Sequence, residues 1–392
     1  MKRLILVAAL AFLVPAVAHA DPISAFSLFG GNLTQLGTGM TVNTGLVGSN
    51  ANMTIGNGSD TLTVLGAGTL TVGTNLNNSI ATNGNIIFNG NVQLGNNADI
   101  NNIDSGGNVT LGTDSTVAGY IKAAGKVTLG NNTDVLGNVD AGAAAGVAVQ
   151  LGTNGSIVGT VTHKVGTTVT FPGSSTIGPD VIGVPATPTA YVPTVLPTPT
   201  TFGPVVGGNV GTGVNGVNYG AVGPGSYNAF DFGTNSIVNL SAGTYLFNTW
   251  DIGNGSTLNL DLSGGDILLF FTGLVDIGTN LNVNLAGGDA SDVYAETKSN
   301  WGMGNGGEWF GTIFGSGATS DITYGTNTSL TGALYATRNL VVGNGGELNL
   351  LAADYLTPST AGPSATPEPS SILLLATGLF GLGLALRRRP QS

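Results

Sequence analysis

The sequence predicts an all-β protein in which a Pro/Thr-rich linker joins two parallel β-helix (solenoid) regions. Short apolar strands with alternating inward and outward positions recur at coil length, and Gly and Asn separate them. Of 392 residues, 65 are Gly, 8% are charged and none is Cys. Because disulfides are excluded, stability must come from packing and backbone hydrogen bonds.

The first predicted β-helical region, residues 21–178, contains a Val-x-Leu-Gly pattern that occurs four times. The copies lie at 92–95, 109–112, 127–130 and 149–152, and a second small strand follows each of them. Strands this short cannot bury a face alone, but coils stacked about 4.8 Å apart form a continuous apolar column. An antiparallel sandwich or barrel permits the same alternation and is the alternative fold. The repeats at 84–162 resemble those of bactofilin-type β-helices.

The stretch from 179 to 225 is predicted to be a Pro/Thr/Gly-rich linker. Six prolines fall between positions 179 and 199, interleaved with Thr, Val and Ala. Such segments are extended and semi-rigid. The functional alternative is O-glycosylation of the linker threonines Thr187, Thr189, Thr194, Thr198 and Thr200.

The second predicted β-helical region, residues 226–356, has the same alternation and more aromatic residues. Its most distinctive segments are 309–314, 331–336 and 340–342. These resemble the C-terminal part of choice-of-anchor A domains, although Gly315 and Ser316 stand where that family usually has Ala-Pro. The resemblance implies a β-helical surface module and no known reaction.

The N-terminus has the pattern of a secretory signal peptide over residues 1–20. Two basic residues precede an apolar run at 4–17, and Ala18 and Ala20 fit the small-residue positions of a signal peptidase site. We therefore expect the mature chain to begin at Asp21.

The C-terminus, after a spacer at 357–366, has three parts in a fixed order within residues 367–392. These are a Pro-Glu-Pro motif, an apolar segment at 372–386 and an arginine cluster, formed by Pro367, Glu368, Pro369, Ser370, Ser371 and by Arg387, Arg388, Arg389. The order resembles the PEP-CTERM sorting signal of Gram-negative bacteria that make exopolysaccharide. The resemblance implies that a membrane transpeptidase, an exosortase, recognises and removes the tail.

The apolar segment 372–386 is short for a permanent membrane span. Fifteen helical residues reach about 22 Å, less than the roughly 30 Å hydrocarbon core. With the arginines held on the cytoplasmic side, we expect a transient inner-membrane anchor; a permanent single span is the alternative.

The charge balance excludes several partners. Without the five basic residues of the two ends, five basic residues stand against 21 acidic ones, a net charge near −16. This excess argues against nucleic acid and anionic membrane surfaces.

β-helices also occur in polysaccharide lyases and hydrolases, so an enzyme of this kind is an alternative. The best carboxylate pairs are Asp289 with Asp292 and Asp261 with Asp266, and neither is joined by a His or basic residue. His163 is expected to be a solvated turn residue. We therefore expect no enzymatic activity and no cofactor.

One stretch, at 56–63, matches most of a calcium-binding β-helix repeat, with Asp60 as the candidate ligand. One coil later Thr69 stands where a second carboxylate is needed. An Asx turn at Asp60 is the expected role and calcium ligation is the alternative.

Ice binding is a third possibility, because the chain is Thr-rich. Ranked Thr-x-Thr pairs would be its signature, and 61–63 and 69–71 are such pairs. The series stops there, since the coils at 92–151 have Val-x-Leu instead.

Together these observations predict an exported, exosortase-sorted structural or adhesive protein of the cell surface or extracellular (biofilm) matrix. Its expected partners are signal peptidase and exosortase during export, then exopolysaccharide or copies of itself. The alternatives are a polysaccharide-processing β-helix enzyme and an ice-binding protein.

Overall fold

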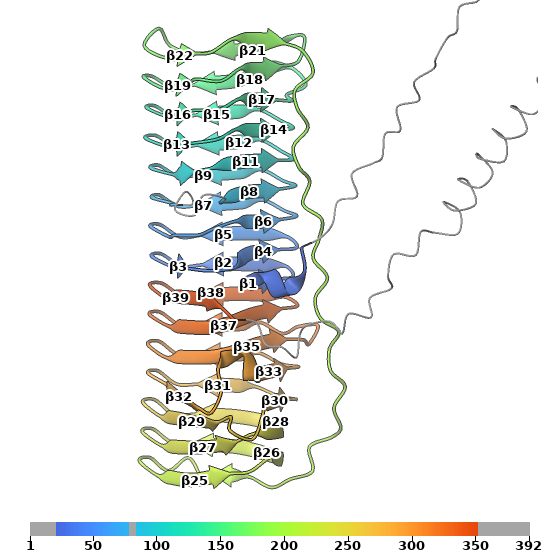
Figure 1. Cartoon of the computed structure of the whole chain (residues 1–392), viewed down its shortest axis with the longest axis vertical. Coiled ribbons are helices and arrows are strands. Elements are labelled where there is room, and N and C mark those ends of the chain that lie inside the picture. The colour runs from blue at the N-terminus through green and yellow to red at the C-terminus, as the bar shows by residue number, and fades with distance from the viewer. Residues whose placement is uncertain (1–20, 78–83, 352–392) are drawn as a thin grey trace, which may run out of the picture. The chain divides into compact units, whose positions relative to one another are not determined.

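The computed structural model describes residues 21–77 and 84–351, and within these ranges every strand pairing is parallel. Most coils contain three short strands, and successive coils stack to form three faces, A, B and C (Figure 1). This confirms the predicted all-β parallel solenoid. The regular helices of the described ranges are two short 3-10 turns, η1 (Ile23–Ala25) and η2 (Ala290–Asp292). None of them is long and apolar enough to cross a membrane.

The strands divide among the faces as follows, and β26, β28, β35 and β37 each turn a corner and contribute to two faces. Face A contains β1 (Phe26–Gly30), β4 (Leu46–Ser49), β6 (Val64–Gly66), β8 (Asn85–Phe88), β11 (Asn102–Ser105), β14 (Ile121–Ala123), β17 (Val139–Ala141), β20 (Val161–His163), β23 (Asp180–Ile182), β30 (Ile267–Phe271), β33 (Val293–Thr297) and parts of β26 (Gly225–Phe232), β28 (Gly243–Ile252), β35 (Glu308–Gly315) and β37 (Ser329–Ala336). Face B contains β2 (Leu33–Leu36), β5 (Asn52–Ile55), β7 (Leu70–Val72), β9 (Val92–Leu94), β12 (Val109–Leu111), β15 (Val127–Leu129), β18 (Gly146–Leu151), β21 (Thr167–Thr170), β24 (Val210–Gly211), β31 (Val275–Ile277), β34 (Trp301–Met303), β36 (Ile322–Tyr324), β38 (Asn339–Val342) and the remainders of β26 and β28. Face C contains β3 (Thr41–Val42), β10 (Asp99–Ile100), β13 (Thr116–Val117), β16 (Asp134–Val135), β19 (Ser156–Ile157), β22 (Thr176–Ile177), β25 (Asn218–Val222), β27 (Ile237–Ser241), β29 (Thr257–Asp261), β32 (Asn282–Ala286), β39 (Glu347–Leu350) and the remainders of β35 and β37.

The Val-x-Leu repeats form face B in the register that the sequence predicts. Val92, Val109, Val127 and Val149 lie opposite one another in successive coils, and each is buried. The residue between each Val and Leu points outward. The inward residues of all coils form one continuous apolar core.

The corner between faces B and C follows a rule that spans two coils. Its third residue is left-handed, as at Asn75 (φ 58°) and Gly58 (φ 60°), a conformation that Gly and Asn adopt most easily. The second residue alternates between Asn and Thr from coil to coil. The Asn side chain accepts a hydrogen bond from the backbone N–H of the Thr in the next coil, as between Asn57 and Thr74 (2.8 Å).

The two predicted β-helical regions form one stack. The chain ascends through residues 26–182, returns to the far end through residues 183–209, and ascends again through 210–350 (Figure 1). The last coil of the second ascent then pairs with the first coil of the first ascent: β37 with β1, β38 with β2, and β39 with β3. The corner rule continues across this junction, because Asn344 accepts from the Thr38 N–H at 2.8 Å.

At the junction, residues from both ends of the chain contribute to a single coil. Leu350 lies opposite Gly332, and Leu28 lies opposite Leu334. Leu28 therefore occupies the place that the second residue after Leu350 would take in an uninterrupted coil. The Tyr335 hydroxyl, buried here, donates to the Phe26 carbonyl at 2.9 Å.

The stretch without strands, 183–209, is shorter than the predicted linker of 179–225, because β23, β24 and β25 pair with the adjacent coils. We call residues 183–209 the strap, since it runs along face A (Figure 1). Polar side chains of face A and its corners accept hydrogen bonds from strap N–H groups: Asp140 from Ala186 (2.9 Å), Asp104 from Thr189 (2.8 Å), Asn89 from Tyr191 (2.8 Å), Asn50 from Thr194 (3.0 Å) and Glu296 from Thr200 (3.0 Å).

The spacing of these bonds explains the strap's composition. Thr189 follows Ala186 by three positions in the strap, while Asp104 lies two coils from Asp140. Three residues of polyproline II rise about 9.3 Å, close to the roughly 9.6 Å of two coils. Prolines therefore fix a conformation whose period matches that of the stack. Thr194, a strap residue and one of the threonines considered for glycosylation, is itself buried.

Candidate functional site

The outward positions of face C form a row of side chains in which every second one is a carboxylate. We call this row the acidic file, and backbone register connects each member to the next. Its members, in stacking order, are Glu308, Ser329, Glu347, Thr41, Asp60, Asn77, Asp99, Thr116, Asp134 and Ser156.

The alternation has a physical cause. Like charges directly opposite each other on neighbouring strands are destabilising, whereas a hydroxyl or amide between them is tolerated. Carboxylates on alternate coils are roughly 9.6 Å apart, twice the strand spacing. The Ser156 hydroxyl, for example, donates to an Asp134 oxygen at 2.6 Å. The file crosses the junction between Glu347 and Thr41 without losing its alternation.

Face B provides the contrast. Asp231, Asp251 and Asp276 lie directly opposite one another on three successive coils. Partial burial and the charges of Asp231 and Asp276 raise the pKa of Asp251. An uninterrupted carboxylate row therefore has an electrostatic cost that the acidic file avoids.

Asp60, the candidate calcium ligand, is a member of the acidic file between Thr41 and Asn77. In the described ranges, no group of three or more His, Cys, Asp or Glu side chains is arranged to hold a metal ion. The arrangement around Asp60 therefore favours its role in the row.

The carboxylate pairs considered for hydrolysis have structural partners. Asp289 caps η2 through the Ser291 N–H (2.8 Å), and Asp292 accepts from the Asp289 N–H (3.0 Å). Hydrogen bonds from Ser263 lower the pKa of Asp261, and those from Ser291 lower the pKa of Asp289. A general acid needs the opposite shift.

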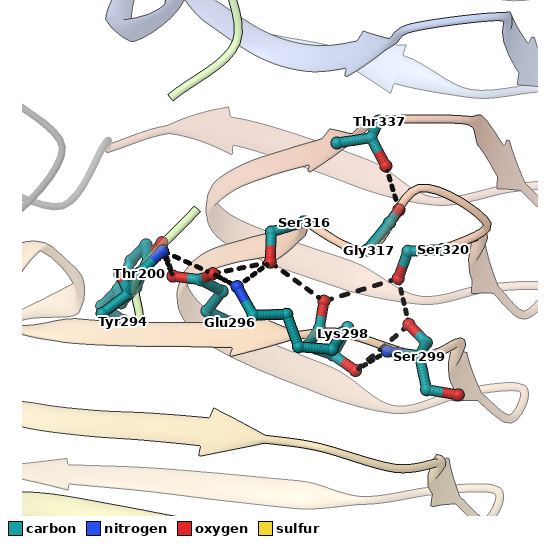
Figure 2. Close-up of polar contacts among 10 residues, drawn as sticks. Thr200, Tyr294, Glu296, Lys298, Ser299, Ser316, Gly317, Ser320 and Thr337 are labelled. Atoms are coloured by element: carbon teal, nitrogen blue, oxygen red, sulfur yellow. Dashed lines mark hydrogen bonds and ion pairs between the residues drawn. The ribbon is translucent and has the colours of Figure 1, made fainter. Parts of the chain in front are cut away.

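A buried polar cluster joins the strap to β33 and the following loop (Figure 2). Glu296 is fully buried, and one of its oxygens, Oε1, accepts from Lys298 Nζ (2.6 Å), Ser316 Oγ (2.6 Å) and the Thr200 N–H (3.0 Å). Its Oε2 accepts from the Tyr294 hydroxyl at 3.1 Å. Together these four donors compensate the Glu296 carboxylate for the loss of water, which would otherwise make its burial costly.

The same cluster contains a Ser–Lys pair, since Lys298 Nζ donates to Ser316 Oγ at 3.0 Å. Ser–Lys catalysis needs a neutral amine that withdraws the hydroxyl proton. Here the Lys298 ammonium is paired with Glu296, and the Ser316 hydroxyl donates a hydrogen bond to the same carboxylate. The geometry favours attachment of the strap over activation of a nucleophile.

His163 is buried, so its expected place in a solvated turn is wrong. Its Nε2 lies 3.1 Å from Asp180, and its Nδ1 lies 2.9 Å from Thr167 Oγ1. The side chain points inward because His163 occupies the inward position opposite Ala141 on face A. It connects the last coil of the first ascent to the coil beneath it.

The Thr-x-Thr pairs do not form ranks. Thr61 is buried, so the segment 61–63 does not present two surface hydroxyls. The outward row of face B instead contains Gln35, Thr54, Thr71, Gln93, Thr110, Thr128 and Gln150 in register. Pairs of Thr are separated by Gln.

The repeat is evident from the sequence, but the acidic file was not predicted from it. The signal was present: Asp60, Asp99 and Asp134 each follow the left-handed corner by the same short interval in alternate coils. The full acidic file becomes visible only at the junction, where the coils of 308–349 and 41–60 lie next to each other.

Comparison with known families identifies a PEP-CTERM protein-sorting motif at residues 365–389. The predicted sorting signal is thus confirmed, and the motif marks the chain as an extracellular or cell-surface protein that an exosortase processes during export. The described residues end before it. The predictions for Ala18, Ala20, Pro367–Ser371, the 372–386 segment and Arg387, Arg388 and Arg389 therefore lie outside the described ranges.

Two solved structures resemble the chain at low identity. One is an ice binding protein from an Antarctic bacterium Flavobacteriaceae, 14% identical, covering 84% of this chain and 97% of that one with a TM-score of 0.23. The other is an ice binding protein from an Antarctic Biological Consortium, 15% identical, covering 65% and 87% with a TM-score of 0.19. At such TM-scores the likeness carries no functional argument. No curated protein sequence matches the chain.

Proposed function

We propose that this chain is a non-catalytic structural or adhesive protein of the cell surface or exopolysaccharide matrix, and that the acidic file is its contact surface. The observation that carries the proposal is the alternation of carboxylates with hydroxyl and amide side chains over ten coils of face C. None of these ten positions holds a Lys or Arg.

The file suits weak, multivalent contact with an extended polymer. Each carboxylate or hydroxyl contributes little on its own in water, but evenly spaced contacts on a stiff stack act together. The negative charge of the body favours partners with amino or other cationic groups.

A co-sedimentation assay of the exported protein tests this proposal. The probes are chitosan as an amine-bearing polysaccharide, cellulose as a neutral one and alginate as an acidic one. We expect retention on chitosan that high salt reverses, because salt screens exposed charges.

Two triple variants distinguish binding by the acidic file from binding by the net charge of the protein. Asp60→Asn, Asp99→Asn and Asp134→Asn together remove three file charges, and Asp231→Asn, Asp251→Asn and Asp276→Asn remove three from face B. We expect the first set to lose most retention and the second to keep it. Equal losses would assign binding to net charge, and no retention on any polymer would refute the adhesive role.

The non-catalytic part of the proposal is tested separately. Incubation with acidic and neutral exopolysaccharides should release no oligosaccharides. Turnover that Asp261→Ala or Asp289→Ala abolishes would establish the polysaccharide-processing alternative.

Ice binding is the second candidate function. The observation favouring it is the outward row of face B, in which Thr54 with Thr71 and Thr110 with Thr128 lie in register. The intervening Gln side chains interrupt a regular hydroxyl array. Inhibition of ice recrystallisation, lost on changing Thr71 and Thr110 to Lys, would favour this function over polymer adhesion.

A further inference from the structure

The coil at one end of the stack leaves the apolar core open. This coil spans residues 167–182 and contains β21, β22 and β23. Its inward-facing Phe171 and Ile182 are 45% and 63% exposed, whereas Leu151 and Ile157 in the coil beneath are about fully buried, at 2% and 1%. Val169 and Ile177 are also only half-buried.

The coil at the opposite end, residues 206–222 with β24 and β25, is open in the same way. Val210 and Tyr219 are half-buried, while Phe230 and Val238 in the next coil are covered completely. Within the described ranges, β21 to β23 and β24 to β25 each pair with a strand on one side only. Repeat proteins normally end in polar capping units, and exposed edge strands pair readily with further strands.

The two open ends match each other. On faces B and C, β21 and β22 at one end and β24 and β25 at the other run in the same order and direction, because the chain ascends the stack in both segments. On face A, β23 lies at one end, and at the other end the strap lies beside β26, where the Asn228 N–H donates to the Gly208 carbonyl at 2.9 Å. One end exposes the upper edges of its strands and the other exposes the lower edges.

The chain already contains a contact of this kind. At the junction, β1, β2 and β3 lie on β37, β38 and β39 without covalent continuity, in register and with buried core residues on both sides. The Gly31 N–H donates to the Ala336 carbonyl at 2.8 Å, and the Gly345 N–H donates in the opposite direction to Thr38 at 2.8 Å. A coil of one segment therefore binds a coil of another through backbone bonds, apolar contact and a few side-chain hydrogen bonds, such as the one from the Thr38 N–H to Asn344.

We propose that the open ends bind a second copy of this chain, with the coil at 167–182 of one copy against the coil at 206–222 of the next. The contact is heterologous: different surfaces of the two copies meet, and the contact repeats along the stack axis. Linear assemblies with continuous parallel sheets result. The strap leaves the ends accessible, because Val184 and Val206, where it joins the end coils, are themselves strongly exposed. This inference goes beyond the proposed adhesive function and does not depend on which polymer the acidic file binds.

Sedimentation velocity and negative-stain electron microscopy of the mature chain, without polysaccharide, test the proposal. We expect a concentration-dependent series of linear oligomers for the unmodified chain. A single monomeric species at all concentrations would overturn the proposal, and it would leave the chitosan experiment unaffected.

Variants at exposed positions identify the surfaces without unfolding the chain. Phe171→Asp blocks one end, and Val214→Asp, at a residue 52% exposed in the other end coil, blocks the opposite end. Each alone should be monomeric, and their equimolar mixture should form dimers only, because one free end of each kind remains. Leu274→Asp, at a residue 49% exposed on the side of the stack, is the matched control and should assemble normally. Assembly that survives both end variants, or that Leu274→Asp abolishes, would refute end-to-end binding.

Discussion

Replacing Leu28 with Ala tests whether the junction makes one cooperative unit of the two segments. Leu28 is fully buried in β1 and lies opposite Leu334 on one side and Val47 on the other. Removing a buried Leu side chain to Cβ costs about 2–5 kcal/mol, with the larger values where the cavity cannot collapse. A loss near 3 kcal/mol changes the unfolding equilibrium constant about 100-fold.

Tryptophan fluorescence during urea unfolding provides an assay that reports on one segment only. All three tryptophans, Trp250, Trp301 and Trp309, are buried in the coils of 210–350. If the segments are coupled, Leu28→Ala in the first segment moves the fluorescence midpoint of the second to lower urea concentration.

Leu129→Ala is the matched control, since Leu129 is also buried but lies several coils away from the junction. In a stack, coupling passes through nearest-neighbour interfaces, so the control should move the fluorescence midpoint less. An unchanged tryptophan transition in Leu28→Ala, together with a separate early loss of circular dichroism, would show that the segments fold independently.

Four further predictions concern topology, charge and processing. A permuted chain that joins Leu350 to Ser27 and opens the strap after residue 203 should keep the β-type circular dichroism and buried tryptophan emission, and loss of either would contradict the junction register. Burial and the hydrogen bond to Asp104 raise the pKa of Tyr120 to about 12. Because the folded state holds this proton more tightly, the stabilisation is complete below pH 10 and disappears as the pH rises towards 12; Tyr120→Phe should flatten that slope in urea titrations. Asp251→Asn should raise the unfolding midpoint at pH 7 and leave it unchanged at pH 3, where the carboxyl is protonated in both states. Mass spectrometry of the surface-exposed protein should find the C-terminus near residue 367 only in cells with the exosortase, and retention of Arg387 to Arg389 on that form would refute processing.

The parallel solenoid and its inward residues were predictable because the information is local. Val109 and Leu111 alternate with a polar residue within one strand, and Gly112 marks the corner that follows. The sorting motif was also predictable, since its three parts are contiguous.

The junction was not predictable from local patterns, because it brings together residues about 300 positions apart, such as Thr38 and Asn344. The strap contacts share this difficulty: nothing near Thr200 indicates that the buried carboxylate of Glu296 will be its partner. His163 was misplaced because a polar residue near a turn resembles a solvated one until the next coil supplies Asp180.

Because both chain segments contribute to the coil at the junction, that coil cannot be completed until the end of the second segment is present during secretion. If the chain is exported amino-terminus first, as the predicted signal peptide implies, the lower edges of β1, β2 and β3 have no strands to pair with until their partners β37 to β39 follow. Until Leu350 has been exported, the edges of β1, β2 and β3 at the middle of the stack remain unpaired. The sorting motif at 365–389 follows that residue closely, so maturation of the fold and delivery of the tail to its processing enzyme become nearly simultaneous events.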